Sequence, residues 1–307
     1  MTQRLLRLSA LPPLTALSAG GGQDTAAILA MLLEDPKFRA RHAPGDLVVI
    51  MSATGDEYRE TDAYVTRMAA LCAARDVPFL HVTPDLGYHT AAWQTLHGQW
   101  ERNTTIQSVA FRRRSCSANL KLAPFYKALN AFVARRYGYV ERVSNQHKAA
   151  LHAYERDYGP LPVLIGFSKG EEVRVKEAPA GFMRTVIRRT YPLMEEGLDR
   201  RGAQEVTAQL GHEVPMPSNC RSCPFASPLD LLRLHHLDPQ AFDTWAGFEA
   251  RKLAAPKWQG TRNHTVLGND LTLLQNLDRA EARYGHLGLE ELDEIRFCRG
   301  HANTTSF

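Results

Sequence analysis

The sequence has no long apolar run: no stretch of its 307 residues reaches the roughly 18 apolar residues that a membrane-spanning helix needs. It also has no internal repeat and no low-complexity segment. The N-terminal arginines and leucines resemble a short signal peptide, but Pro12 and Pro13 interrupt them and a glycine-rich turn follows. We therefore interpret this stretch as part of the fold and expect a cytoplasmic protein with no membrane partner.

Cysteine is scarce, and its count of five is odd. An odd number in a chain of cytoplasmic character argues against a disulfide framework, so metal binding, redox chemistry or packing is expected instead. Cys72 lies in an apolar helical pattern with Met68 and Leu71. That pattern predicts a core position for Cys72.

A strong charge of one sign is also missing, because the net charge is only +4. Hydrophobic content of 44% and charged content of 23% are ordinary for a globular protein with a substantial core. The arginines nevertheless occur in groups, which indicates either solvated helix faces or contacts to phosphate. These groups are Arg112–Arg114, Arg135–Arg136, Arg188–Arg189 and Arg200–Arg201.

Short apolar runs alternate with helical patterns in the first half of the chain. The runs predict strands at 14–19, 46–53, 77–84 and 161–168, and the patterns predict helices at 25–35, 60–76 and 121–138. Such alternation is typical of a doubly wound, mostly parallel α/β sheet. We expect this nucleotide-binding domain to span 1–204, and a smaller α-rich region with three of the cysteines to span 205–307.

A glycine-rich turn lies between the first expected strand and the first expected helix. Its residues are Ser18, Ala19, Gly20, Gly21, Gly22, Gln23, Asp24 and Thr25. Glycines let the backbone approach an anion, and the helix N-terminus adds a favourable field, so the turn predicts a phosphate site. The alternative is that the glycines only permit tight packing. The turn has neither the Gly-Lys-Ser/Thr of a Walker A motif nor a spaced GxGxxG.

Five segments, in order along residues 18–225, resemble the PP-loop adenine-nucleotide α-hydrolase superfamily, in the branch of the phosphoadenylyl-sulfate (PAPS) reductases. The first is the SAGGGQDT turn, similar to the family's SGGxD(S/T) loop. The others are Thr54–Glu57 with Glu60-Thr61, Arg113–Cys116 with Leu120-Lys121 and Pro124, Ile165–Ser168 with Glu171-Glu172 and Arg174, and Tyr191–Leu193 followed by Cys220–Phe225.

This resemblance implies an adenine-nucleotide-dependent enzyme of sulfur metabolism or sulfur transfer. Asp24 and Thr25 suit the members that cleave ATP to AMP and pyrophosphate, so that an acceptor is adenylated and sulfur then displaces AMP. One alternative is reduction of adenylyl sulfate or PAPS to sulfite with a thiol reductant. A second is a nucleotide- or nucleic-acid-binding component of a DNA modification or defence system.

The family's motifs also imply site residues in this chain. Lys121 and Arg174 are the expected phosphate contacts, and the expected catalytic residues are these two together with Asp24 and Cys298. Asp56, Glu57 and Glu60 are expected either to contact ribose or Mg²⁺ or to stabilise a helix N-terminus. The nucleotide-binding set implied by the resemblance is Ser18, Gly20, Gly21, Gly22, Asp24, Thr25, Thr54, Gly55, Glu57 and Arg114.

The remaining cysteines have the spacing of a metal site. Cys220 and Cys223 form a CxxC pair that can chelate one metal, hold two corners of a cluster or act as a redox pair. The resemblance implies a 4Fe-4S cluster on this pair with Cys116 as third ligand. Ser115 stands where the family has its fourth cysteine, so the fourth ligand must come from elsewhere, and Cys298 is the candidate. The alternatives are zinc, with Cys298 and His301 completing the set, and Cys298 as a nucleophile that attacks sulfur.

Overall fold

The computed structural model describes residues 11–110, 115–140, 148–175, 183–258 and 264–299, and it divides the chain into two compact units. Each unit is assembled from three separate stretches of sequence. Unit 1 comprises 1–52, 63–82 and 123–215, and unit 2 comprises 53–62, 83–122 and 216–307. The boundary expected between 204 and 205 falls inside the helix α10 (Arg200–Gln209), whose Ala203 belongs to the unit 1 core.

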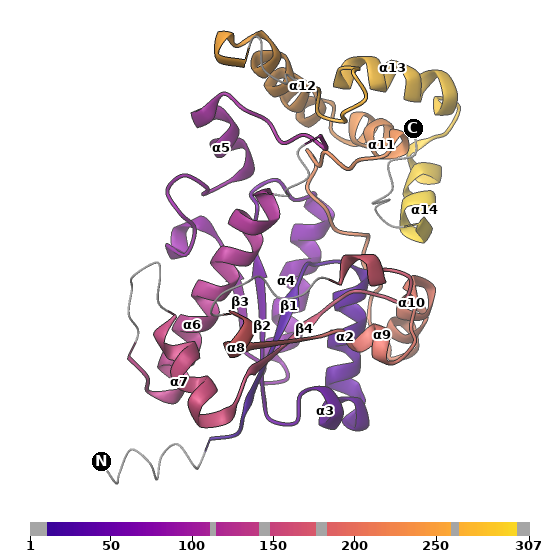
Figure 1. Cartoon of the computed structure of the whole chain (residues 1–307). Helices are drawn as coiled ribbons and strands as arrows, with labels where there is room; N and C mark the ends of the chain where they lie inside the picture. The colour runs from indigo at the N-terminus through magenta and orange to yellow at the C-terminus, as the bar shows by residue number, and fades with distance from the viewer. Residues whose placement is uncertain (1–10, 111–114, 141–147, 176–182, 259–263, 300–307) are drawn as a thin grey trace. The chain divides into compact units, whose positions relative to one another are not determined.

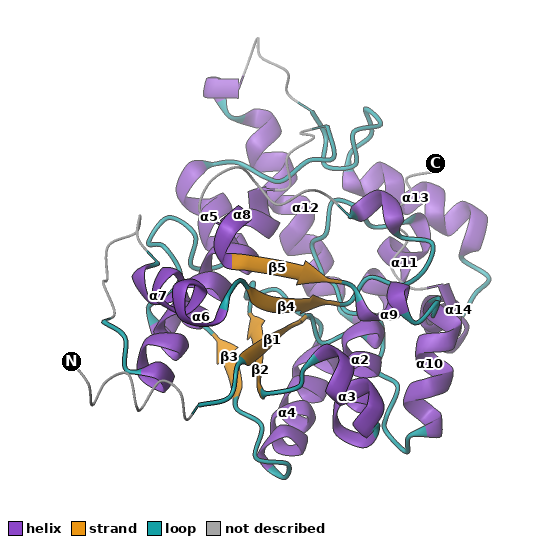
Figure 2. Ribbon diagram, turned by 60° about the horizontal axis from the view of Figure 1, so that its bottom comes forward, coloured by secondary structure: helices purple, strands orange, loops and turns teal. Residues whose placement is uncertain are grey.

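Unit 1 contains a five-stranded sheet in which every neighbouring pair is parallel (Figures 1 and 2). The strand order β3-β2-β1-β4-β5 confirms the expected doubly wound α/β fold. Four strands lie where apolar runs predict them, whereas β5 was not predicted. The strands are β1 (Leu14–Ala19), β2 (Asp46–Ser52), β3 (Phe79–Val82), β4 (Leu161–Ile165) and β5 (Ile187–Thr190).

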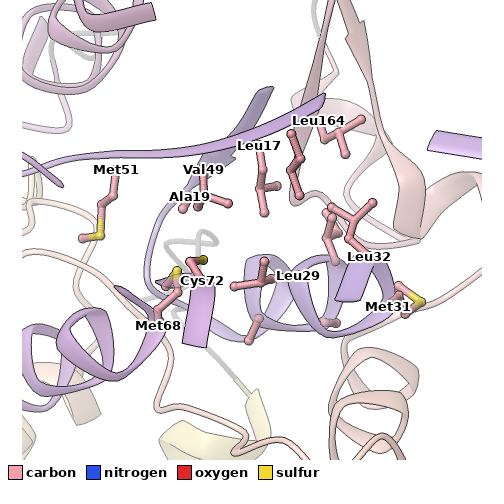
Figure 3. Close-up of a cluster of buried hydrophobic side chains, with 14 of the residues drawn as sticks. Leu17, Ala19, Leu29, Met31, Leu32, Val49, Met51, Met68, Cys72 and Leu164 are labelled. Atoms are coloured by element: carbon pink, nitrogen blue, oxygen red, sulfur yellow. The ribbon is translucent and has the colours of Figure 1, made fainter. Parts of the chain in front are cut away.

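Helices pack on both faces of this sheet, because alternate strand residues point to opposite sides. Leu17, Val49 and Leu164 pack with α2, α4 and α10 in one buried cluster (Figure 3). Cys72 of α4 is fully buried there, which confirms its expected core position. The helices with residues in unit 1 are α2 (Gln23–Glu34), α3 (Pro36–His42), α4 (Arg59–Ala73), α6 (Ala123–Tyr137), α7 (Ala149–Tyr158), α8 (Met183–Val186), α9 (Pro192–Glu195) and α10.

Unit 2 is built from helices around its own apolar core. Trp100, Phe242 and Trp245 are its largest fully buried side chains. Capping boxes begin two of its helices, through Ser227 and Asp230 at α11 and through Thr272 and Gln275 at α13. Its helices are α5 (Leu96–Asn103), α11 (Pro228–Leu237), α12 (Pro239–Ala254), α13 (Leu273–Tyr284) and α14 (Leu289–Arg299), with a wide π-helical stretch at Ser117–Leu122 and short 3-10 turns at Pro84–Leu86 and Pro256–Trp258.

Candidate functional site

The glycine-rich turn of unit 1 follows β1, next to the point where the order of the strands reverses. The chain adds β2 and β3 on one side of β1 and then returns to place β4 on the other side. Ser18 at the end of β1 pairs with Ile165 at the end of β4, so the loops after the two strands are neighbours. In doubly wound sheets, ligands bind outside the carboxyl ends of the strands at such a switch point.

The backbone of the turn explains its glycines. Gly21 has a φ of +69°, in the left-handed region that other residues rarely adopt. Gly22 is the residue that precedes α2, and having no side chain it provides no cap for the helix. The Thr25 hydroxyl instead donates to the Gly22 carbonyl (3.1 Å) and accepts from the Gly20 amide (3.4 Å). The first-turn amides of α2 are therefore presented to an anion.

The loop after β4 approaches this turn closely. A Cβ at Gly166 would lie 2.9 Å from Thr25 Cγ2 and 3.1 Å from the Thr25 amide nitrogen. Only glycine fits at that distance without displacing the helix N-terminus. The SAGGGQDT turn and the IGFS segment, which both resemble motifs of the family, thus form one surface at the end of the sheet.

The Asp24 carboxyl lies in the first turn of α2 and interacts with charges from two other segments, the loop after β4 and the start of α10. Burial raises its pKa to about 6, and Glu171 adds to the increase, while Arg200 and Arg174 partly oppose it. Its Oδ1 is buried and has no hydrogen-bond partner within the described parts of the chain. A carboxyl in this state can give up its proton close to neutral pH or receive a new donor.

Arg174 is held beside the turn by an aromatic stack and a carboxylate. Its guanidinium lies 4.2 Å from the centroid of the Phe167 ring, which itself stacks on Tyr191 with centroids 5.7 Å apart. Glu171 accepts a hydrogen bond from Arg174 and another from the Ser168 amide (3.2 Å). The positive charge predicted to contact phosphate is therefore fixed in position before any ligand binds.

Arg200 was not singled out by sequence reasoning, which only grouped it with Arg201. The structure separates the two side chains. Arg200 donates to Gln23 Oε1 (3.3 Å) at the start of α2, whereas the exposed Arg201 pairs with Glu205 one turn along α10 (2.7 Å). Nothing in the sequence near α10 marks this difference, because the contact of Arg200 joins segments that are far apart in the chain.

The Thr54–Glu57 segment belongs to unit 2, where Glu57 organises its own loop. The Glu57 carboxylate accepts from the Thr54 amide (2.8 Å) and hydroxyl (2.6 Å), and from the amides of Gly55 (3.0 Å) and Asp56 (3.2 Å). Gly55 has a φ of +77°. These amides belong to the loop that precedes α4, so stabilisation of the helix N-terminus by Glu57 stays a prediction. A ribose or Mg²⁺ contact of Glu57 also stays a prediction.

Asp56 holds the CxxC loop. Its carbonyl accepts from the Arg221 amide and its Oδ2 from the Ser222 amide, both at 2.8 Å. Its Oδ1 lies 3.5 Å from His97 Nε2 and 3.4 Å from Arg221 Nε. Burial raises the pKa of the Asp56 carboxyl, and His97 and the Ser222 amide partly offset this. Asp56 is thus a structural residue of the cysteine loop.

Three cysteines lie around the Lys121 ammonium in unit 2. Burial raises the pKa of both Cys220 and Cys116, and Lys121 opposes the increase for each thiol. Desolvation tends to lower the pKa of Lys121, but Cys220, Glu57 and the other two thiols raise it above its ordinary value. Cys220 Sγ also lies 3.2 Å from the Thr54 hydroxyl. Cys116, Cys223 and Cys220 are therefore close enough to influence one another's ionisation.

The fourth predicted cysteine does not share this arrangement. Cys298 is exposed near the end of α14. Within the described ranges, no group of three or more His, Cys, Asp or Glu side chains is placed to hold a metal ion. The described residues therefore do not form a ready cluster site, and iron–sulfur or zinc binding stays a prediction. Arg114 and His301 lie outside the described residues, and Glu60 pairs with Arg233 (2.9 Å).

Comparisons with protein-family models, with curated proteins and with solved structures found no match. What this chain does is therefore inferred from its own residues. None of the described helices is long and apolar enough to cross a membrane.

Proposed function

We propose that the chain is a PAPS reductase-like, adenine-nucleotide-dependent enzyme of sulfur transfer that cleaves ATP to AMP and pyrophosphate. One observation carries the proposal: the glycine turn after β1 and the loop after β4 meet at the switch point of a doubly wound sheet, within reach of two arginines. Phosphate groups favour a helix N-terminus with free amides and nearby guanidinium groups.

Each residue of this surface has a role in the proposal. The α2 amides bind the β and γ phosphates, which leave as pyrophosphate, and the Thr25 hydroxyl holds the turn that presents these amides. Arg174 and Arg200 neutralise the charge that develops on the leaving group. Glu171 and Phe167 hold Arg174, and Gln23 accepts a hydrogen bond from Arg200. The buried Asp24 carboxyl interacts electrostatically with both guanidinium groups. Mg²⁺ bound by the phosphates would add further charge neutralisation.

The reaction proceeds in two displacements. An oxygen of the acceptor attacks the α phosphorus, the bond from this phosphorus to the bridging oxygen breaks, and pyrophosphate leaves with the electron pair. A sulfur nucleophile from a donor then attacks the activated carbon of the acceptor, and AMP leaves with the acceptor oxygen. Sulfide supplies this nucleophile without a change of oxidation state, so no step is assigned to the thiols of Cys116, Cys220 and Cys223 or to a metal cluster.

Reduction of a sulfonucleotide is the second candidate, and the exposed thiol of Cys298 favours it. There the thiol would attack the sulfur of adenylyl sulfate or PAPS and release the nucleotide, and a thiol reductant would then release sulfite. This route leaves ATP intact and depends on Cys298.

Chromatography of the nucleotide products separates the two candidates. The protein is incubated anaerobically with ATP, adenylyl sulfate or PAPS, each with a thiol reductant, a sulfide donor and a nucleic-acid acceptor. AMP and pyrophosphate from ATP, lost in Arg200→Gln and retained in Arg201→Gln and Cys298→Ser, are the expected result. Consumption of a sulfonucleotide with ATP untouched, abolished by Cys298→Ser, would replace the first proposal with the second.

A further inference from the structure

A hollow of about 120 Å³ opens in unit 2 beside α5. An enclosed engineered cavity of about 150 Å³ accepts benzene. This hollow is somewhat smaller but open to solvent, so a single six-membered ring is the largest group that suits it. Its wall combines aromatic, amide and hydroxyl side chains. It is lined by Trp93, Gln99, Trp100, Thr105, Ile106, Gln107 and Ser115.

Gln99 supplies an unused amide in this wall. The residue is only 9% exposed, and its carboxamide makes no hydrogen bond to the rest of the described chain. The amide atoms are not among the fully buried polar atoms, so solvent reaches them, and a ligand that offers both a donor and an acceptor can replace water there. Across the hollow, the Ser115 hydroxyl donates to Gln107 Oε1 (2.7 Å) and fixes the second amide.

The two amides and the aromatic wall suit a planar ring with polar edges. A glutamine carboxamide offers a donor and an acceptor side by side, the pattern that matches the edge of a nucleobase. Trp93 is half-buried and provides a ring face, and base stacking on such a face is favourable for every base. An apolar ligand of the same size would leave Gln99 without a partner.

Within the described chain, no charged side chain lines the hollow, but cations and another indole contact or belong to the end of α5 beside its lining residues. Arg102 and Lys257 are exposed, and Lys257 donates to the Asn103 carbonyl at the end of α5. The Trp258 indole donates to the Thr104 carbonyl (2.7 Å), next to the lining residue Thr105. Arg251 lines an adjoining hollow that shares Trp100 and Thr105, with Glu101 as the acid among its lining residues. Cations interleaved with aromatic rings bind single-stranded nucleic acid.

We infer that unit 2 binds single-stranded nucleic acid, with one pyrimidine-sized base in the hollow and the phosphates along Arg102, Arg251 and Lys257. Ser115 is part of the wall of the hollow and precedes Cys116 in the sequence, so the bound base lies beside Ser115. The inference rests on the proposed function only in naming this strand as the acceptor. Binding of the strand does not require ATP.

Fluorescence anisotropy with a labelled short oligothymidylate tests this, with an abasic strand of equal length as the second probe. In the wild type, removing the bases should weaken binding about tenfold or more, the order expected for one amide-read, stacked base. Gln99→Met keeps the side-chain volume without the amide, and Trp93→Leu removes the ring. Both variants should bind the two probes almost equally.

The matched control is Gln94→Met, because Gln94 is exposed, follows Trp93 in sequence and does not line the hollow. It should behave as the wild type. Arg102→Gln with Lys257→Gln should weaken both probes and reduce the salt dependence. Equal binding of the two probes by the wild type, absence of binding at low salt, or an unchanged preference in Gln99→Met would overturn the inference.

Failure of the inference differs from failure of the proposed function. Arg200→Gln should lose ATP cleavage but bind oligothymidylate as the wild type does. If ATP is cleaved and no strand binds through Gln99, the inference is wrong and the proposed function stands. If the strand binds and ATP is not cleaved, the proposed function is wrong and the inference stands. If thymidine monophosphate binds as tightly as a longer strand, the inference that the ligand is a strand would also be overturned.

Discussion

Asp24 is an acidic residue of unit 1 whose pKa its surroundings raise towards neutral pH. Burial raises its pKa from an ordinary value of 3.8 to about 6. Between about pH 4 and pH 6 the folded chain therefore binds more protons here than the unfolded chain, and the free energy of unfolding falls as pH rises through this window. The stabilising state is the neutral acid, and it is lost above pH 6.

Replacing Asp24 by asparagine should remove this pH dependence. At about pH 8 the Asp24→Asn variant should unfold with a free energy higher by roughly 1–2 kcal/mol, after allowance for the partial exposure of the side chain. At about pH 4 the two proteins should be equally stable. Urea unfolding at both pH values measures the difference, and an Asp24→Asn variant that is less stable at pH 8 would contradict the assignment of burial as the main cause.

At the scale of elements, the close approach of the β4 loop to α2 depends on Gly166. Gly166→Ala places a methyl group 2.9 Å from Thr25 Cγ2 and 3.1 Å from the Thr25 nitrogen, so the helix start or the loop must shift. We expect a loss of about 1–3 kcal/mol in unfolding free energy and weaker nucleotide binding.

Gly247→Ala is the matched control for that change. Gly247 lies in α12, and a Cβ there meets no atom within 4 Å. The same substitution should therefore stabilise the protein by about 0.5–1 kcal/mol through helix propensity. Thermal unfolding of both variants should give shifts of opposite sign. Equal shifts would show that the contact with Thr25 is unimportant.

The elements that sequence reasoning found are those with enough apolar residues to mark them. The predicted strand at 14–19 has the same bounds as β1, and the expected helix at 60–76 is α4. β5 was missed because its sequence, Ile187-Arg188-Arg189-Thr190, has one apolar residue and an arginine pair, which does not mark a strand. The strand lies at the edge of the sheet. α5 was missed because it is short and polar, although it carries Gln99 and Trp100 of the hollow.

The candidate site was predictable to the extent that it is local in sequence. The glycine turn and Arg174 were identified from the chain alone, and the structure brings their segments together through Gly166. Arg200 could not be found this way, because its contact with Gln23 arises only when α10 packs against α2. The carboxylate of Glu57 likewise shows its loop contacts only in three dimensions.

At the scale of the whole molecule, the two units are interleaved along the chain. Tyr58, Leu96 and Trp100 come from the earlier stretches of unit 2, but they pack in one core with Leu231, Phe242 and Trp245 from the last stretch. No single cut in the chain therefore separates one intact unit from the other. The sequence suggests two consecutive domains, because nothing in it indicates that the chain alternates between the two units.

Ending the chain at Pro215 should consequently expose the early part of the unit 2 core. We expect residues 1–215 to aggregate, since Trp100 and its apolar neighbours lose their partners. Supplying 216–307 as a separate chain should recover soluble protein. Size-exclusion chromatography of the two preparations tests this, and a monomeric, cooperatively folded 1–215 fragment would contradict the interleaved division.

The central claim is that a nucleotide binds through its phosphates at the turn between β1 and α2. Its most direct test is the dissociation constant of α,β-methylene-ATP, which is not cleaved between the α and β phosphates, for Arg200→Gln and Arg201→Gln. The two variants lose the same charge from adjacent positions, but only Arg200 faces the turn. At least tenfold weaker binding in Arg200→Gln, with Arg201→Gln equal to the wild type, is predicted. Equal weakening in both variants, or no binding by the wild type at millimolar nucleotide, would contradict it.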